Sequence, residues 1–401
     1  MPTSLAARPR AERAPATVSL ICGAIAVAAT IVPVAGALGV RGWDPSTLVR
    51  MGDTEPISTL ARRVHPDFKF VHPDAHYDGV YFYAVALDPL ARGEAHTLID
   101  KAAYRYGHAG YGWMAGLLSF GNEGAVPAAL MLLAIAGMGI AAWATSMLCA
   151  ALGWTAWGGL GVALNPGLIY AATAVTSEPV GAAFLLLGLL HWVRERHVAG
   201  AALLAVACFV KEPFVLAPVG LILWEAISMA RARLAAQPTL ASGAPGLLGI
   251  PGLDGARVRR IGMLCIGPGL FALWYLYLHS TFGTWPHEET HGFLTFPFWG
   301  WIETIRLGSL MATGTYLGSQ IGAAAGPLLA AFGGLVILGL VLAVRLRSPV
   351  DPIYLLIALL ISTLGPLGML YAKDMIRETA LPLMLLPAVV AGWRATATSE
   401  P

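Results

Sequence analysis

Apolar runs separated by short polar segments recur along the chain from Val18 to the C-terminus. Most of these runs approach the roughly 20 residues that an α-helix needs to cross about 30 Å of hydrocarbon. Strands of a membrane barrel would alternate polar and apolar residues, and the sequence has no such period. The pattern therefore predicts an all-α, polytopic bundle with about ten transmembrane helices. Their expected ranges are 18–40, 125–151, 157–175, 179–193, 199–210, 213–230, 261–280, 311–344, 353–371 and 379–393.

The composition agrees with a membrane protein and excludes two other classes. Of the 401 residues, 57% are hydrophobic and only 12% are charged, which is outside the range of water-soluble domains. The net charge of +2 is small, and no basic patch has interleaved aromatic residues, so nucleic acid is not an expected partner. Each cysteine lies in an apolar run, which predicts small core residues rather than disulfides or thiolate ligands of a metal. The cysteines are Cys22, Cys149, Cys208 and Cys265.

The positive charges predict the orientation of the chain. Residues 1–17 hold three arginines, and the apolar run that follows is longer than the about 7 to 15 residues of a cleaved signal peptide. We therefore expect a cytoplasmic N-terminal tail and a retained first helix. Residues 18–401 then form a single transmembrane domain in the plasma (inner) membrane, with 41–110 as the first outer loop. The segment 231–260, rich in glycine, proline and arginine, is expected to be a flexible cytoplasmic connector.

Acidic and basic residues mix at the helix ends on the expected outer side. They are Ser177-Glu178, Lys211-Glu212, residues 287–291 and residues 373–378. An ionisable group costs several kcal/mol when it is driven into hydrocarbon, so such groups usually line a cavity or a substrate path. The sequence therefore predicts one outward-facing polar site assembled from many helix ends.

The most polar part of the first outer loop is HPDAHYDGVYFYAVALDP, residues 72–89. A helix over 77–87 would lie along the membrane surface with Asp78 and Tyr81 on one face and an apolar face in the bilayer interface. Asp78 would stand in the first turn, where the helix dipole favours the ionised carboxylate, and Pro89 would end the element. An ionised carboxylate there suits a general base, and a helix cap or a solvated loop acid is the structural alternative.

A divalent metal site is a further alternative for the same loop. Two His-Pro-Asp tripeptides, at 65–67 and 72–74, and the nearby His76 provide imidazole and carboxylate groups, which are ligands for such ions. The adjacent prolines and the lack of a helical spacing between the histidines argue against it. We expect no required cofactor, with a divalent cation as the less favoured alternative.

Short motifs that combine tyrosine, charged residues, glycine and proline recur at the expected outer helix ends. The first is Tyr77-Asp78-Gly79 followed by Tyr81, Tyr83, Ala86 and Asp88-Pro89. Further motifs are Tyr104-Arg105-Tyr106-Gly107-His108, Ser177-Glu178-Pro179, Lys211-Glu212-Pro213, and Arg377 with Pro382. Together they resemble motifs of bacterial membrane proteins in the GT-C glycosyltransferase superfamily, whose members are polytopic enzymes that use polyprenyl-phosphate sugars. The resemblance implies that Asp78, in the first outer loop, is the catalytic base.

The chain departs from this resemblance at three points. An arginine is common in the family where this chain has His108, so the positive charge there depends on pH. Many relatives carry a large soluble domain after the membrane part, whereas this sequence ends shortly after its last apolar run, and we expect the outer loops to bind the acceptor. It has no Asp-x-Asp motif similar to that of the metal-dependent oligosaccharyltransferases, which favours a mechanism without metal.

The resemblance implies transfer of a sugar from a polyprenyl-phosphate donor to an acceptor hydroxyl on a glycan, lipid or protein. The reaction would occur at the extracytoplasmic face beside membrane lipid, with inversion at the anomeric carbon and Asp78 as the general base. The candidates for binding the donor phosphate are Arg105, Lys211, Arg377 and His108. The candidates for contacting the sugar or the acceptor are Tyr77, Tyr81, Asp88, Glu178 and Glu288. No residue is assigned as a metal ligand.

Structural roles remain open for several of these side chains. Arg105 and Arg377 are also suited to reaching the lipid headgroups. Lys211 and Glu212 could form an ion pair with each other, and Glu178 could cap the helix that it opens. The aromatic and acidic loop that includes Glu288 is also suited to anchoring at the membrane interface.

Two other classes of protein are alternatives to the enzyme. A secondary transporter, or a flippase for a lipid-linked substrate, is the main one, because Lys211-Glu212-Pro213 and the glycine-rich residues 308–326 resemble broken helices around a solute site. Its charges should lie near the middle of the membrane, whereas here nearly all are expected at one face. A non-catalytic membrane partner is the third class, and it would tolerate Asp78→Asn.

Overall fold

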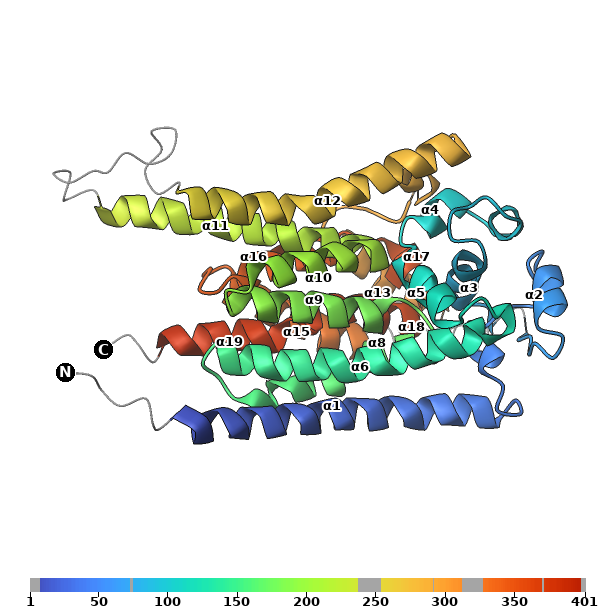
Figure 1. Ribbon diagram of the computed structural model, residues 1–401, viewed down its shortest axis with the longest axis horizontal. Coiled ribbons are helices and arrows are strands. Elements are labelled where there is room, and N and C mark those ends of the chain that lie inside the picture. Colours follow the sequence, from blue (N-terminus) through green and yellow to red (C-terminus); the bar gives the residue numbers. More distant parts are fainter. Residues whose placement is uncertain are drawn as a thin grey trace.

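The computed structural model describes residues 8–72, 75–236, 254–290, 292–311, 327–369 and 371–397. These residues form helices and connecting segments (Figure 1), with two isolated bridges, Gly52 to Val71 and Leu294 to Leu364. The prediction of an all-α fold is confirmed for the described part of the chain. Asp74, His291 and most of the segments 231–260 and 308–326 lie outside the described residues.

The α-helices are α1 (Arg8–Gly39), α2 (Ser58–Val64), α3 (Gly79–Leu87), α4 (Ala102–Tyr106), α5 (Gly110–Leu118), α6 (Val126–Ala151), α7 (Leu160–Ala163), α8 (Pro166–Thr173), α9 (Glu178–Val193), α10 (His197–Val210), α11 (Leu216–Ala236), α12 (Gly255–Phe282), α13 (Trp299–Met311), α15 (Gly334–Ala343), α16 (Val350–Ser362), α17 (Pro366–Met369), α18 (Ala372–Leu383) and α19 (Leu386–Ala397). Short 3-10 helices are η1 (Pro45–Val49), η3 (Ala95–Leu98), η4 (Glu123–Ala125), η5 (Ala156–Gly159), η6 (Glu212–Val215) and η8 (Pro286–Thr290), and η9 (Leu329–Gly333) is a π-helical turn.

Several helices have the length and composition to cross a membrane. Within the described residues, five segments qualify: Pro15–Gly39, Glu123–Ala151, Glu212–Leu234, Gly255–Phe282 and Ala372–Ala395. The outermost of them expose large apolar side chains, for example Val32 on α1 at 73% and Leu273 on α12 at 61%. Such surfaces are unfavourable in water and favourable in hydrocarbon, so they fit a multi-pass membrane protein.

Two of the predicted long helices are interrupted. The expected span at 157–175 is divided into η5, α7 and α8, because Pro166 cannot continue a helix and Asn165 caps α8 by accepting hydrogen bonds from two backbone N–H groups. The expected span at 353–371 ends with α16 at Ser362, and the short α17 begins at Pro366. The prediction of one continuous helix at each of these places is wrong.

The segment expected to be the first outer loop is a folded cap at one end of the bundle, on the right in Figure 1. α2, α3, α4 and α5 gather there, at the end opposite to the first residues of α1 and the last residues of α19. Within the cap, large side chains form a hydrophobic cluster that continues onto α1 and α6. Its fully buried members include Met51, Ile57, Tyr83 and Tyr111.

α3 lies inside this cap, so the prediction that its apolar face rests in the bilayer interface is wrong. Every side chain from Gly79 to Ala86 is buried. Two glycines make this packing possible. A Cβ at Gly79 would come within 2.7 Å of the carbonyl oxygens of Val49 and Ala174, and one at Gly112 on α5 would come within 2.6 Å of Val85. The predicted end of the helix is confirmed, because α3 stops at Leu87, before Asp88-Pro89.

The cysteines are mostly, but not all, core residues. Cys22, Cys149 and Cys208 are buried and free, as expected. Cys265 is exposed on α12, which is one of the helices with an apolar outer surface. The prediction that it is buried in the protein core is therefore wrong.

Candidate functional site

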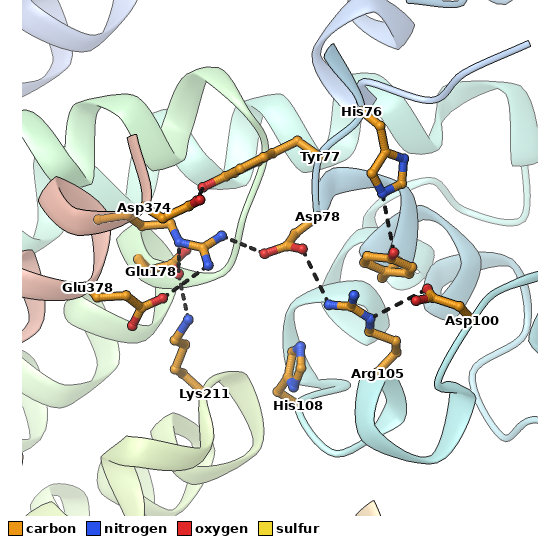
Figure 2. Close-up of polar contacts among 12 residues, drawn as sticks. His76, Tyr77, Asp78, Asp100, Arg105, His108, Glu178, Lys211, Asp374 and Glu378 are labelled. Atoms are coloured by element: carbon orange, nitrogen blue, oxygen red, sulfur yellow. Dashed lines mark hydrogen bonds and ion pairs between the residues drawn. The ribbon is translucent and has the colours of Figure 1, made fainter. Parts of the chain in front are cut away.

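Charged side chains from distant parts of the sequence meet where the cap joins the bundle (Figure 2). Asp78 lies immediately before α3, Arg105 is on α4, and Glu178 begins α9. Lys211 lies between α10 and η6, and Arg377 is on α18. These are the residues that the sequence predicted to share one polar site, and the structure brings them together.

Asp78 is at the centre of this group and is held by two arginines. Its Oδ2 accepts a hydrogen bond from Nη1 of Arg377 at 2.5 Å, and its Oδ1 lies 3.3 Å from Nη1 of Arg105. The side chain of Asp78 is 29% exposed, whereas those of Arg105 and Arg377 are 14% and 12% exposed. The carboxylate is therefore the most accessible of the three groups.

The charge state of Asp78 follows from these contacts. Burial by itself would raise the pKa of the Asp78 carboxyl, but the guanidinium groups of Arg377 and Arg105 outweigh it and hold the pKa well below its usual range. Asp78 is therefore ionised at neutral pH. It is also a weak base as long as both arginines stay in place, because a proton would have to displace two favourable ion pairs.

Glu178 organises the second half of the site and is almost fully buried, at 1% exposure. Its Oε1 accepts a hydrogen bond from Nζ of Lys211 at 2.6 Å and lies 3.5 Å from Nε of Arg377. Its Oε2 has no hydrogen-bond partner among the described residues. Arg377, which also donates to Glu378 at 3.0 Å, therefore links Asp78 to the Glu178 pair.

The expected ion pair between the neighbours Lys211 and Glu212 is not formed. Lys211 has extended backbone angles, φ −153° and ψ 127°, so adjacent side chains point in opposite directions. Lys211 turns to Glu178, and Oε1 of Glu212 accepts a hydrogen bond from Nδ1 of His108 at 2.7 Å. Burial would lower the pKa of the Lys211 ammonium, but the Glu178 carboxylate outweighs it and raises the pKa, so Lys211 keeps its charge.

Tyr77 stands on the other side of Asp78 and faces three cations. Its hydroxyl donates to Oδ1 of Asp374 at 2.6 Å. Its ring centroid lies 4.5 Å from Nζ of Lys373, 5.1 Å from Cζ of Arg377 and 5.6 Å from Cζ of Arg50. Burial raises the pKa of the Tyr77 phenol, so it remains a neutral donor.

Sequence reasoning missed part of this arrangement. Arg50 follows η1 and donates to the hydroxyl of Tyr170 at 2.8 Å and to that of Thr173 at 3.4 Å. Lys373 and Asp374 belong to the polar segment 373–378, and that mixture of acids and bases next to Arg377 was the available signal. Arg50 carried no comparable signal, since it lies in no motif and at no helix end of the apolar pattern.

The ring of Tyr81 stacks against the guanidinium of Arg105. The Arg105 guanidinium lies 3.4 Å from the centroid of the Tyr81 ring, and the Tyr81 hydroxyl is 3.2 Å from Nε2 of His76. Nδ1 of His76 is in turn 2.8 Å from Oε1 of Glu55. This chain of contacts fixes the ring on which Arg105 stacks, so Tyr81 and His76 help to position one of the two arginines on Asp78 (Figure 2).

Two predicted acceptor-binding carboxylates lie in loops of their own. Asp88 is buried, and its oxygens accept hydrogen bonds from the backbone N–H groups of Arg92 and Gly93 and contact Nδ1 of His96 at 2.8 Å. Glu288 is exposed and accepts from the backbone N–H of Trp285 at 2.9 Å. Among the described residues, neither carboxylate contacts the group around Asp78. The described residues also include no set of three or more His, Cys, Asp or Glu that could hold a metal ion.

Comparisons with known proteins assign no family to the chain. No protein-family model matches it, and no curated protein matches it significantly. A functional assignment therefore depends on the chemistry of the site and on the membrane character of the fold.

Proposed function

We propose that the protein is a membrane glycosyltransferase of the GT-C type, which transfers a sugar from a polyprenyl-phosphate donor to an acceptor hydroxyl. The observation that supports this most is the position of Asp78. An ionised and partly exposed carboxylate stands among several cations that are less exposed than it is, at one end of a bundle whose outer helices are suited to lipid. A base beside cations is what attack by a hydroxyl and departure of a phosphate require.

The proposed reaction assigns one step to each part of the site. Asp78 takes the proton from the acceptor hydroxyl while the oxygen of that hydroxyl forms a bond to the anomeric carbon. The bond between that carbon and the phosphate oxygen breaks, and the polyprenyl phosphate leaves with the electron pair. Arg105, Arg377 and Lys211 stabilise the charge that develops on the leaving phosphate. Attack from the side opposite to the phosphate inverts the anomeric configuration.

The ion pairs of Asp78 would make proton abstraction follow binding of the donor. Before the donor binds, both arginines face Asp78 and keep its proton affinity low. A bound phosphate competes for the same guanidinium groups, which weakens their hold on the carboxylate and makes it a stronger base. Proton abstraction is then favoured only when the donor phosphate is bound, so Asp78 does not deprotonate water or other hydroxyls in the empty site.

The proposal also includes an orientation. The site would face the extracytoplasmic side, with the N-terminus cytoplasmic and with the shorter apolar helices, such as α9 and α10, completing about ten crossings. The opposite end of the bundle has the turn after α9 with Arg194 and Arg196 and the turn after α15 with Arg345 and Arg347. Arginine-rich turns are typical of the cytoplasmic side.

The test uses the full chain in lipid nanodiscs with a panel of polyprenyl-phosphate sugars and host membranes as the source of acceptor. Release of free polyprenyl phosphate is followed by mass spectrometry. The wild-type protein is expected to release it from at least one donor, and Asp78→Asn is expected to reduce the rate by a factor of about 10² to 10⁴ while the protein stays folded. The matched control is Asp67→Asn, an exposed acid in the same cap.

The same preparation distinguishes the enzyme from the alternative classes. In sealed vesicles, a transporter or flippase would move the lipid-linked sugar across the membrane without breaking its bond to phosphate. Translocation without release of polyprenyl phosphate, or equal release by the wild-type protein and Asp78→Asn, would contradict the proposal.

A further inference from the structure

The cations that surround Asp78 are already paired with acids of the protein. Arg105 and Arg377 face Asp78, and Lys211 faces Glu178 at 2.6 Å. An anion that arrives at any of these cations has to compete with a carboxylate that is covalently held in place. These groups are therefore suited to stabilising a transition state, and less suited to capturing a substrate from the membrane.

Arg50 and Lys373 differ from them. Within the described ranges, neither forms an ion pair with a carboxylate. Arg50 donates to two neutral hydroxyls, those of Tyr170 and Thr173, at 2.8 and 3.4 Å. These contacts hold the guanidinium in position without neutralising its charge, and they leave other N–H donors for a ligand. Neither side chain is fully buried, so a ligand can reach both.

Both cations converge on the ring of Tyr77, at 5.6 Å for Cζ of Arg50 and 4.5 Å for Nζ of Lys373. The backbone carbonyl of Arg50 also accepts a hydrogen bond from the N–H of Tyr77 at 3.2 Å. Arg50 has φ of 55°, in the left-handed region that is unfavourable for a residue with a side chain. Its position next to Tyr77 is therefore imposed by the fold and maintained despite a local cost.

We propose that Arg50 and Lys373, with Tyr77 and Tyr170 between them, form a subsite for the phosphate group of the lipid-linked substrate. The inference rests on the proposed function and deepens it, because it separates capture of the phosphate from catalysis. The planar fork of arginine and the point charge of lysine are a common pair for phosphate oxygens. The edge-to-face pair of tyrosine rings, with centroids 5.5 Å apart, forms the wall between the two cations.

Arg377 connects this phosphate subsite to the base. Its guanidinium lies 5.1 Å from the Tyr77 ring centroid and also donates to Asp78 at 2.5 Å. A phosphate bound between Arg50 and Lys373 would therefore draw Arg377 toward itself and away from Asp78. Binding of the substrate in the phosphate subsite would thus prepare the carboxylate to accept a proton.

The test measures binding of farnesyl phosphate to the full chain in detergent by isothermal titration calorimetry. The wild-type protein is expected to bind farnesyl phosphate and to bind farnesol at least about tenfold more weakly, since a charge-assisted contact to phosphate is lost. Arg50→Gln and Lys373→Gln are each expected to weaken binding of farnesyl phosphate by roughly tenfold. Unchanged affinity in both variants would overturn the phosphate subsite.

Two matched controls use the same substitutions at exposed positions of the same cap. Arg62→Gln and Lys69→Gln remove one positive charge each, away from Tyr77, and are expected to bind as the wild-type protein does. Lys373 donates no side-chain hydrogen bond within the described ranges, so Lys373→Gln is expected to keep the fold even if Arg50→Gln loses it. Size-exclusion chromatography and thermal unfolding check both variants.

Competition experiments identify the source of the phosphate. Displacement of farnesyl phosphate by millimolar inorganic phosphate supports recognition of the phosphate group, provided that Arg50→Gln also weakens the binding of inorganic phosphate. Equal displacement by phosphatidylglycerol would overturn the assignment to the substrate, because it would indicate a general headgroup site.

The test of the phosphate subsite can fail or succeed independently of the test of the proposed glycosyltransferase activity. If Asp78→Asn abolishes release of polyprenyl phosphate while Arg50→Gln and Lys373→Gln bind normally, the enzyme is supported and the phosphate subsite is wrong. If both variants lose binding but no donor is processed, the phosphate subsite is supported and the proposed reaction is wrong.

Discussion

The two ends of the bundle each hold a carboxylate between two arginines, and they differ in which group is accessible. At the end opposite to the cap, Glu225 on α11 accepts hydrogen bonds from Arg257 at 2.9 Å and from Arg260 at 2.8 Å. The acid is the most buried member there, with 9% exposure against 18% and 23% for the arginines. At Asp78 the order is reversed, since the acid is more exposed than both arginines.

The origin of the arginines differs as well. Arg257 and Arg260 lie one turn apart on α12, so together with Glu225 they join two neighbouring helices. Arg105 and Arg377 come from α4 and α18, which are 27 and 299 positions away from Asp78. The cluster at Glu225 therefore has the form of a structural clamp. The cluster at Asp78 presents its acid at the junction of several elements, which is the arrangement of a site.

The largest expected effect is the contrast in turnover between the two acids. Asp78→Asn removes the proposed base and is expected to slow release of polyprenyl phosphate by a factor of about 10² to 10⁴. Glu225→Gln is expected to leave turnover within about twofold of the wild type, because the clamp takes no part in the chemistry. Comparable losses in both variants would remove the functional distinction between the two ends.

Removal of the buried acid Glu178 is expected to lower the stability of the protein. Glu178→Gln leaves the half-buried cations Lys211 and Arg377 with one carboxylate fewer, which is expected to reduce the free energy of unfolding by about 3 to 5 kcal/mol. Denaturant unfolding in detergent measures it. Glu123→Gln, at an exposed position of the same end, serves as the control and is expected to change little.

The clamp at the opposite end is expected to contribute less. Glu225→Gln should lower the free energy of unfolding by about 1 kcal/mol, because Arg257 and Arg260 can turn toward water when the carboxylate is removed. The same denaturant series measures the difference. A loss as large as that of Glu178→Gln would show that both ends are equally dependent on buried charge.

The smallest effect concerns pH. Because the pKa of folded Asp78 lies below its unfolded value, its ion pairs contribute stability that is fully present above the unfolded pKa of about 3.9 and is lost as the pH falls through the folded value. The difference in melting temperature between the wild type and Asp78→Asn is therefore expected to be constant from pH 5.5 to 8, within about 1 °C. A difference that shrinks steadily below pH 7 would indicate a carboxyl whose pKa is raised instead.

The prediction of the fold from sequence succeeded where the determining interactions are local. Long apolar runs became helices, and α3 ended before Asp88-Pro89, since proline restricts its own residue and the one before it. The same local rule explains the failure at 157–175. Pro166 interrupts an apolar run there, and apolarity alone carries no information about the break.

Which charged residues lie close together was predictable for those in recognisable motifs. The sequence predicts that Asp78, Arg105, Glu178, Lys211 and Arg377 share one polar site, and they meet in the structure. Their pairing was less predictable. The extended backbone at Lys211 directs it to Glu178 rather than to its neighbour Glu212, and the local sequence does not specify that backbone conformation.

The sequence by itself determined that this chain is helical, suited to a membrane, and polar at particular helix ends, because these properties follow from residue composition over a few helical turns. Only the tertiary structure decided which charges neutralise one another and which remain available. It brought Arg50 and Lys373 to the same tyrosine and made Asp78 more accessible than its arginines. The strength of an ion pair depends on distance and burial in three dimensions, and neither quantity is encoded in the spacing of two residues along the chain.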